Sequence, residues 1–246
     1  MSDDVSRETP SVPDEARRVF ASGRLPLAER YAALLATDGV LRGLIGPREA
    51  PRLWTRHVLN CAVLGEWVPE GAAVADIGSG AGLPGIVLAV ARPDLSVTLI
   101  EPLLRRTTFL TEVVETLGLD RVEVVRGRAD ALHGTRRFDV VTSRAVAPLG
   151  RLLEWSMPLV DARGALVAMK GATVHEEIVE AEPVLRRLGC APPEVRELGV
   201  GVLAESTGAV RVSWADPASV SWPPATAADA PRGPAGKRGR SSRKRR

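Results

Sequence analysis

The 246-residue sequence predicts an α/β fold, in which a doubly wound, mostly parallel sheet follows a helical N-terminal extension. Two patterns support this prediction. From Val74 onward, short β-branched runs alternate with amphipathic segments, and such alternation produces parallel strands with helices on both faces. Before Val74, apolar residues recur at three- and four-residue steps over residues 11–68, as they do along amphipathic helices.

The expected elements follow in order along the chain. The N-terminal extension, residues 1–68, contains helical patterns at 14–25, 27–41 and 53–68. Strands are expected at 74–77, 96–101, 122–126, 138–143 and 165–170. Further helices are expected at 84–91, 105–117, 149–160 (interrupted late by Pro158) and 174–188.

Two more strand-like runs, "EVRELGVGV" and "AVRVSWA", follow residue 190 with no helix between them. Without a crossover helix, consecutive strands pair most simply as an antiparallel hairpin, which would complete the sheet. The sheet domain is therefore expected to span residues 69–217.

Charge is distributed unevenly along the chain. Residues 231–246 contain eight Lys or Arg and no acidic residue, which leaves 25 basic against 30 acidic residues elsewhere. A linker rich in Ala, Pro and Ser precedes this basic tail, and we expect residues 218–246 to be disordered. The tail suggests a polyanionic partner, and a solvated, solubilising tail is the alternative.

Several classes of protein find no support in the sequence. The longest apolar runs, such as "IVLAVA", are too short to span a membrane, and the acidic, polar N-terminus is unlike a signal peptide. Cys61 and Cys190 lie far apart, and the three histidines have no ligand spacing. We therefore expect a cytoplasmic protein without a membrane anchor, a disulfide or a metal site.

The stretch "VADIGSGAGLPG" at 74–85 ends the first expected strand in a glycine-rich loop, a pattern typical of nucleotide-like ligands. It contains GxGxxG, which indicates NAD, and also D-x-G-x-G-x-G beginning at Asp76, which indicates S-adenosylmethionine. A dinucleotide would bring an anionic pyrophosphate to this strand end, whereas S-adenosylmethionine brings an α-ammonium and a sulfonium. The carboxylate of Asp76 favours the cationic ligand, with Gly78 and Gly80 in the binding loop.

The next two strand ends offer groups for an adenosine. Glu101 ends the second strand, where its carboxylate can accept hydrogen bonds from both ribose hydroxyls of either cofactor. After the third strand, Asp130 can accept from the adenine amino group, and the main-chain N–H of Ala129 can pair with a ring nitrogen. The alternative role of Asp130 is to cap the short helix that follows.

Two motifs that are absent from the sequence narrow the range of possible methyl acceptors. Methyltransferases of exocyclic amines commonly carry an Asn/Asp-Pro-Pro-aromatic run after the fourth strand, where this chain has "TSRAVAPL". Carbon-5 methylation of pyrimidines needs a cysteine nucleophile near the fourth or fifth strand end, and neither Cys61 nor Cys190 is there. A ring nitrogen, a small molecule or a protein remains as the acceptor.

The motifs "DIGSGAGLPG", "SRA" at 143–145, "MKG" at 169–171 and "RH" at 56–57 resemble those of the RsmG family, also called glucose-inhibited division protein B. The resemblance covers roughly residues 20–215. It implies a Rossmann-like fold of the class I methyltransferase type and S-adenosylmethionine as cofactor. It further implies methylation of guanine N7 in the decoding-region loop of 16S rRNA.

The resemblance also implies roles for individual residues. Gly78 and Leu83 would contact the cofactor in the loop, Ala129 and Asp130 would hold its adenine, and Arg144 would stand beside its methionine end. The family positions on the RNA side of the cleft correspond to Arg56, His57 and Lys170. Asn60 and Cys61 stand where many relatives have Asp and Ser, so no acid is expected to act there.

Guanine N7 carries a free lone pair at neutral pH, so its methylation needs no general base. We accordingly expect no acid–base catalytic residue, and binding groups that only position cofactor and RNA. The expected state is a monomer that binds 16S rRNA or the small ribosomal subunit. Two alternatives come from other classes of protein: an NAD-binding oxidoreductase, and a non-catalytic RNA-binding protein on the same fold.

Overall fold

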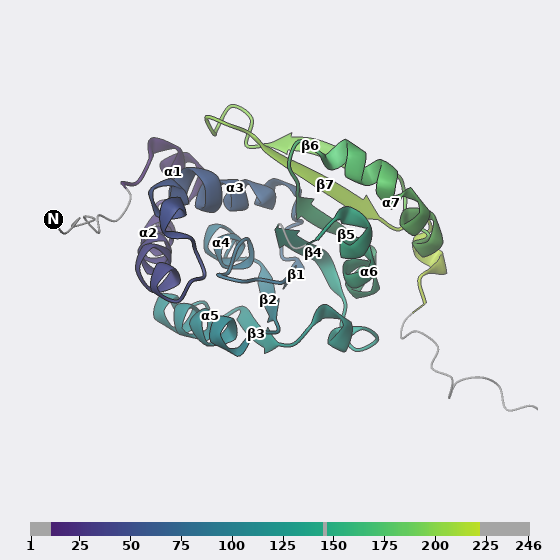
Figure 1. The fold of residues 1–246 in the computed structure, drawn as a ribbon, viewed down its shortest axis with the longest axis horizontal. Coiled ribbons are helices and arrows are strands. Elements are labelled where there is room, and N and C mark those ends of the chain that lie inside the picture. The colour runs from purple at the N-terminus through teal and green to yellow at the C-terminus, as the bar shows by residue number, and fades with distance from the viewer. Residues whose placement is uncertain (1–10, 145–146, 222–246) are drawn as a thin grey trace, which may run out of the picture.

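The computed structural model describes residues 11–144 and 147–221, which form one seven-stranded sheet in the order β3-β2-β1-β4-β5-β7-β6 (Figure 1). Five strands run parallel, and each lies close to its expected place: β1 (Ala73–Ile77), β2 (Ser96–Glu101), β3 (Val122–Arg126), β4 (Phe138–Arg144) and β5 (Val160–Met169). The doubly wound α/β prediction is confirmed.

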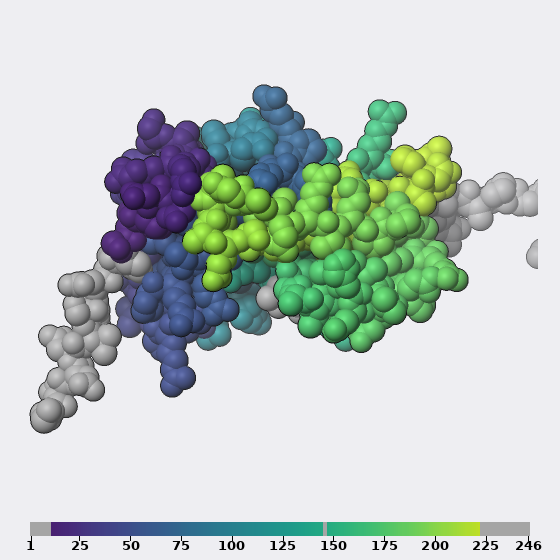
Figure 2. Space-filling view, turned by 90° about the horizontal axis from the view of Figure 1, so that it is seen from above, coloured from purple at the N-terminus to yellow at the C-terminus, as the bar shows by residue number. Residues whose placement is uncertain are grey.

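The expected hairpin completes the sheet. Strand β7 (Thr207–Ser213) runs antiparallel between β5 and β6 (Glu194–Leu198), so the last strand in sequence is not the edge strand. The turn region of this hairpin reaches the N-terminal segment, where the main-chain N–H of Gly199 donates to Glu66 at 2.9 Å. Figure 2 shows the yellow-green hairpin lying against the purple N-terminal residues.

Helices cover both faces of the sheet because buried side chains alternate along each strand. In β1, Val74 packs into a core with α4 (Gly85–Ala91) and α5 (Leu104–Leu117), whereas Ala75 packs on the opposite face. That opposite face is covered by α6 (Leu149–Ser156) and α7 (Val174–Leu188), as Figure 1 shows. The period of two residues therefore builds two cores, one on each side of the sheet.

The N-terminal extension is less regular than expected. It contains α1 (Asp14–Val19), α2 (Leu25–Leu34) and the short α3 (Leu59–Ala62). These helices are joined or extended by π-helical and 3₁₀ turns at Leu35–Gly39, Pro47–Arg52, Leu53–Val58 and Val63–Trp67. Most of the periodic apolar residues are nevertheless buried, because the turns at Leu35–Gly39, Leu53–Val58 and Val63–Trp67 still direct side chains into the core, whereas Pro47–Arg52 buries none and Leu41 is exposed.

The extension shares its core with the sheet domain. Tyr31 and Leu64 are fully buried in the same cluster as Leu88 of α4. The side chain of Arg24, just before α2, donates to the main-chain oxygen of Val90 at 2.8 Å near the end of α4. Residues on both sides of the expected boundary at 68 therefore stabilise one packed layer.

Two boundaries differ from the sequence prediction for clear physical reasons. The expected helix at 149–160 ends at Ser156, because Pro158 has no N–H to continue the helical bonding, and β5 begins at Val160. At the C-terminus, Pro217–Ser219 form a 3₁₀ turn, and Arg137 donates to the main-chain oxygen of Ser221 at 2.9 Å. The folded part thus extends past residue 217, and the rest of the expected linker and tail lies outside the described residues. Within the described residues, no helix is long and apolar enough to cross a membrane.

Candidate functional site

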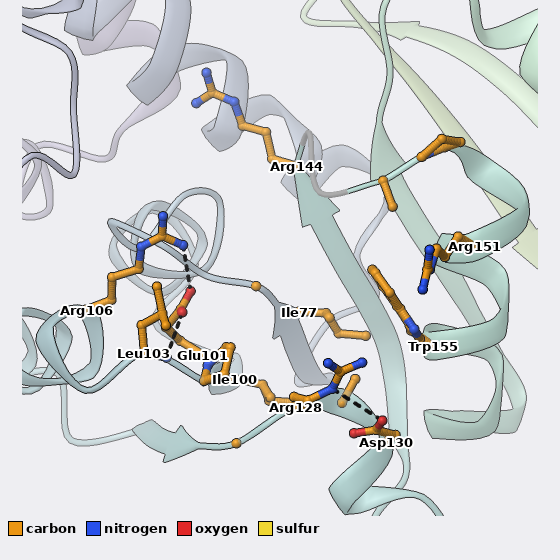
Figure 3. Close-up of a pocket in the computed structure, with 16 residues that line it drawn as sticks. Ile77, Ile100, Glu101, Leu103, Arg106, Arg128, Asp130, Arg144, Arg151 and Trp155 are labelled. Atoms are coloured by element: carbon orange, nitrogen blue, oxygen red, sulfur yellow. Dashed lines mark hydrogen bonds and ion pairs between the residues drawn. The ribbon is translucent and has the colours of Figure 1, made fainter.

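The carboxyl ends of the parallel strands surround a cavity of about 840 Å³ (Figure 3). Its walls come from Gly78 after β1, Glu101 at the end of β2, Asp130 after β3 and Arg144 at the end of β4, with Trp155 of α6 opposite. This is the switch point of the sheet, where the chain order reverses between β1 and β4. The sequence motifs therefore converge on the edge at which α/β sheets bind their ligands.

The loop after β1 is shaped by its glycines. Gly78, Gly80 and Gly82 all have positive φ angles, and a Cβ atom on Gly82 would lie 2.5 Å from the side chain of Ile86 and 2.9 Å from the hydroxyl of Tyr31. The same hydroxyl donates a hydrogen bond of 2.8 Å to the main-chain oxygen of Ala81. The N-terminal extension thus supports the glycine loop from below.

Asp76 lies beneath this loop rather than in the cavity wall. It is fully buried, and its Oδ2 accepts a hydrogen bond of 2.9 Å from the main-chain N–H of Gly85. Its Oδ1 is buried with no hydrogen-bond partner among the described residues. Burial raises the pKa of the Asp76 carboxyl to about 7. An acceptor without a donor at this strand end fits a ligand that carries N–H groups or positive charge.

Glu101 has both carboxylate oxygens anchored by the main chain. Oε2 accepts from Gly80 N–H at 3.1 Å, and Oε1 accepts from Leu103 N–H at 3.0 Å. Arg106 adds an ion pair at 3.4 Å, and the Glu101 side chain is almost completely buried. Oε2 accepts from both Gly80 and Arg106, whereas Oε1 keeps a second lone pair. The carboxylate is therefore held rigidly at the cavity wall, and a ligand hydroxyl can bond to Oε1 directly and to Oε2 in exchange for the long bond from Arg106.

The region after β3 is more open. Ala129 and Asp130 line the cavity from a short 3₁₀ turn, Ala129–Leu132, as Figure 3 shows for Asp130. The Asp130 side chain is 54% exposed and pairs with Arg128 at 3.4 Å. It does not cap this turn, because the capping position belongs to Arg128, whose side chain makes no capping bond. Asp130 is therefore free to exchange its arginine partner for a ligand.

Beside this turn lie two residues that no sequence motif singled out, and His133, just after the turn, bonds to the main-chain oxygen of Trp155 at 2.9 Å. Arg151 and Trp155, both on α6, line the wall, and the guanidinium of Arg151 stands 5.4 Å above the ring centre of Trp155. An indole facing the expected adenine position offers an apolar surface for a flat base. In the sequence, the only indication of this surface was an aromatic residue, Trp155, in the amphipathic helix expected at 149–160.

A second cavity, of about 900 Å³, adjoins the first and shares Arg144, Ala147 and Pro148 with it. In Figure 3 the Arg144 side chain points away from Trp155, toward the N-terminal helices. There its guanidinium bonds to Nδ1 of His57 and lies 3.7 Å from the sulfur of Cys61, which is also 3.9 Å from the sulfur of Met169. Arg144 therefore stands between the two cavities, held from the N-terminal side. The expectation that no cysteine lies near the ends of the fourth and fifth strands is therefore wrong, because the N-terminal extension folds back onto them. Burial raises the pKa of the Cys61 thiol to about 11, which disfavours a nucleophilic thiolate.

The three residues expected on the RNA side lie near one another but differ in accessibility. Arg56 lines the second cavity and is 59% exposed. His57 is buried, and its Nε2 lies 2.9 Å from Glu49. Lys170 also lines the cavity, but its ammonium is committed to Glu177 at 2.6 Å and to the main-chain oxygen of Ala147 at 2.9 Å.

Two expected cofactor residues do not line the cavity: Leu83 is buried within the glycine loop, and Gly80 donates its main-chain N–H to Glu101. Within the described part of the chain, no group of three or more His, Cys, Asp or Glu side chains could hold a metal ion. The described residues instead place hydrogen-bonding and charged side chains, such as Glu101, Arg144 and Arg56, around two adjoining cavities that could each hold a polar ligand.

Comparison with known proteins adds independent findings. A family model described as rRNA small subunit methyltransferase G matches residues 24–200. A protein of a Nocardioides species named ribosomal RNA small subunit methyltransferase G is 72% identical over 223 residues, covering 91% of this chain and 89% of that protein. A Streptomyces coelicolor protein of the same name is 57% identical over 206 residues, covering 83% and 86%.

Solved structures resemble this chain in fold. The crystal structure of M. jannaschii TYW2 in complex with AdoMet aligns with a TM-score of 0.50 at 17% identity, covering 65% of this chain and 76% of that one. At this identity the likeness shows the fold alone.

Proposed function

This chain belongs to the rRNA small subunit methyltransferase G family, and from that premise we propose that it transfers the methyl group of S-adenosyl-L-methionine to N7 of a guanine in the decoding-region loop of 16S rRNA. The observation that carries the proposal is the pair of adjoining cavities that share Arg144. A methyl transferase needs two such spaces, one for the donor and one for the acceptor, with a short path between them. We assign the methyltransferase domain to residues 69–217 and the supporting extension to residues 1–68.

The hydrogen-bonding and charged groups of the first cavity fit the cofactor. Glu101 would accept from the ribose hydroxyls, and Ala129 with Asp130 would bind the adenine edge beside Trp155. Arg144 fits the α-carboxylate, whereas Asp76 lines neither cavity and would act on the α-ammonium through its charge from beneath the glycine loop. When bound, the cofactor supplies an electrophilic methyl group on a sulfonium. Leu83, Gly78 and Gly80 shape the loop that would close over its methionine part.

The second cavity fits the acceptor base. Arg56 lies exposed at the cavity wall and would neutralise an RNA phosphate. Lys170 donates to the main-chain oxygen of Ala147 and would hold that part of the cavity wall in place for the RNA. Because N7 attacks through a free lone pair, no side chain has to remove a proton. The residues contribute by alignment, which can supply about 7–11 kcal/mol of the barrier.

The two alternatives lose their support. Membership of a methyltransferase family argues against an NAD-dependent oxidoreductase, as does a buried carboxylate beneath the loop where a pyrophosphate would bind. A non-catalytic RNA-binding protein would have no use for the rigid carboxylate of Glu101 at the first cavity. We place the reaction in the cytoplasm, with its ribosomal substrate, and expect a monomer that sedimentation would reveal.

Methyl transfer to defined RNA tests the proposal. Purified protein, labelled S-adenosylmethionine and either 16S rRNA or small subunits from cells lacking the modification should yield one labelled guanine, which mass spectrometry can map. Replacing that guanine by 7-deazaguanine should abolish transfer and leave RNA binding nearly unchanged. Transfer to the deaza substrate, or to another atom, would overturn the N7 assignment.

A further inference from the structure

Arg144 is the residue at which the two cavities meet, so its position matters for both ligands. It ends β4, and its guanidinium is bound by His57 from the π-helical turn Leu53–Val58. A sulfur contact at 3.7 Å with Cys61 of α3 is the other contact of this guanidinium that involves a side chain among the described residues. The orientation of Arg144 therefore depends mainly on His57.

The chemistry of these groups fixes the tautomer of His57. A guanidinium has only N–H donors, so Nδ1 of His57 must accept and the ring proton must lie on Nε2. That Nε2–H is donated to Oε2 of Glu49 at 2.9 Å. Glu49 lies on the 3₁₀ turn Pro47–Arg52, and its carboxylate is 35% exposed. Three side chains thus connect the protein surface to the wall between the cavities.

We propose that Glu49 is a positioning residue for methyl transfer: by accepting from Nε2–H, it fixes the orientation of the His57 ring and, through Nδ1, the guanidinium of Arg144 at the junction of the two cavities. This inference rests on the proposed function, because the junction matters only if donor and acceptor occupy the two cavities. Glu49 itself lines neither of them. Its action is indirect, as a carboxylate orients an imidazole in many catalytic sites.

The charges around the imidazole determine how this arrangement responds to pH. Three charged groups act on the His57 ring: Glu49 from the preceding turn, Arg144 from β4 and Arg56 from the same turn as His57. The thiol of Cys61, on α3, lies beside the Arg144 guanidinium. Burial and the two arginines lower the pKa of His57, and Glu49 opposes them. The ring is therefore neutral at pH 7. Protonation at lower pH would place a second N–H against Arg144 and break their bond.

The bonding itself can be measured without any activity assay. The chain has three histidines, His57, His133 and His175, so ¹⁵N NMR signals can be assigned with single His→Gln variants. We expect His57 to be the neutral Nε2–H tautomer at pH 7 and to titrate below its ordinary value. In Glu49→Ala, Nδ1 must still accept from Arg144, so the tautomer should stay Nε2–H, but the pKa of His57 should fall further because the carboxylate that raises it is gone. A protonated His57 at pH 7, or an unchanged pKa of His57 in Glu49→Ala, would overturn the inference whatever the protein methylates.

Single-turnover rates then test the positioning role. Glu49→Ala should lower the rate on the pH plateau by about 10- to 100-fold, as small misplacements do. Glu49→Gln can still accept from Nε2–H, so it should recover most of that loss. Without the carboxylate charge, however, the pKa of His57 should be lower in this variant, so the acid limb of its pH profile (the loss of rate as His57 is protonated) should move to lower pH. The control is Glu112→Gln, which removes a comparable carboxylate from the distant ion pair with Arg42 and should leave the profile unchanged.

Two substitutions of His57 complete the test. The Oδ1 of Asn can occupy the position of Nδ1 and accept from Arg144, whereas the Oε1 of Gln reaches the position of Nε2. His57→Asn should therefore keep more activity than His57→Gln and should lose the acid limb. Equal rates for Glu49→Ala and the native protein across the pH range would refute the positioning role. If the native protein transfers no methyl group while the NMR result holds, the proposed function fails instead.

Discussion

The hydroxyl of Tyr31, on α2, donates a hydrogen bond of 2.8 Å to the main-chain oxygen of Ala81 in the glycine loop, 50 residues further along the chain. Both partners are buried. The bond connects the N-terminal extension to the loop that lies beside the first cavity, and it involves the only tyrosine of the protein.

Replacing Tyr31 by Phe keeps the ring in the core and removes the hydroxyl. The buried oxygen of Ala81 then loses its donor, which should lower the free energy of unfolding by about 1–3 kcal/mol. A less constrained loop should also bind S-adenosylmethionine several-fold more weakly in calorimetry. Thr37→Ala is the matched control, since it removes an exposed side-chain bond to a main-chain oxygen at 2.8 Å on the neighbouring turn. Unchanged stability and affinity in Tyr31→Phe would show that the loop holds its shape alone.

Asp76 should make the cofactor-free protein less stable as the pH rises. Burial raises its pKa in the folded state to about 7. In the unfolded chain the value is about 3.9. The folded state therefore binds this proton more tightly, so the contribution to stability is complete below about pH 4 and is lost as the pH rises to about 7. Above that range the contribution no longer changes.

Asp76→Asn removes this dependence, because the amide is neutral and can still accept from Gly85 N–H. The variant should gain stability relative to the native protein between pH 5 and pH 8, by an amount on the order of a few kcal/mol. It should also bind S-adenosylmethionine more weakly, having lost the charge opposite the ammonium. Chemical denaturation at the two pH values measures the first effect, with the exposed Asp120→Asn as control. An equal difference at both pH values would contradict the assignment.

Asp130→Ala tests the adenine contact. A hydrogen bond to a charged acceptor contributes about 1.5–3 kcal/mol, so affinity for S-adenosylmethionine should fall by about tenfold or more. Stability should barely change, because the Asp130 side chain is half exposed and its pair with Arg128 spans 3.4 Å. Calorimetric titration decides the matter: an affinity equal to that of the native protein would remove Asp130 from the cofactor site.

The basic tail should contribute to RNA binding and not to cofactor binding. Truncation after Ala230 removes eight Lys or Arg residues. Each RNA phosphate that the tail no longer neutralises should reduce the slope of log K against log salt by roughly 0.7–0.9. Binding to a 16S rRNA fragment at several salt concentrations measures the slope, and cofactor titration serves as the control. Identical slopes for the two proteins would show that the tail does not touch RNA.

The rate of methyl transfer should be nearly independent of pH on the alkaline side. Because N7 needs no deprotonation, single-turnover rates should stay constant between about pH 7 and 9, without the bell shape of acid–base catalysis. Rapid-quench measurements at saturating cofactor would show this. A tenfold increase per pH unit across that interval would require a general base and contradict the N7 acceptor.

The sequence predicted the sheet well because its strands carry strong local signals. The runs "SVTLIE" and "VEVVR" are bounded by turn residues, and their ends agree with β2 and β3. Glu101 and Arg144 could be selected for the same reason, since the side chain that ends a parallel strand lies at the ligand edge. The N-terminal turns were harder to predict, because periodicity does not distinguish an α-helix from alternating π and 3₁₀ turns.

Contacts between distant residues could not be predicted. The bond from Arg144 to His57 spans 87 positions, and nothing in the sequence near Glu49 indicates that its carboxylate would bond to the other nitrogen of that imidazole. Lys170 was expected to face RNA, yet its ammonium binds Glu177 and Ala147. That arrangement depends on how α7 packs beside the end of β5, which is a property of the whole fold.

The core that the N-terminal helices share with α4 also affects how the protein is made. Tyr31, Leu53 and Leu64 leave the ribosome before the residues that bury them, including Leu88 and Leu99, have been synthesised. The nascent chain therefore emerges with an uncovered apolar stripe, the kind of surface that chaperones bind and that promotes aggregation. This core can be complete only after β2 has been synthesised, so a pause in translation before that strand would prolong the exposure.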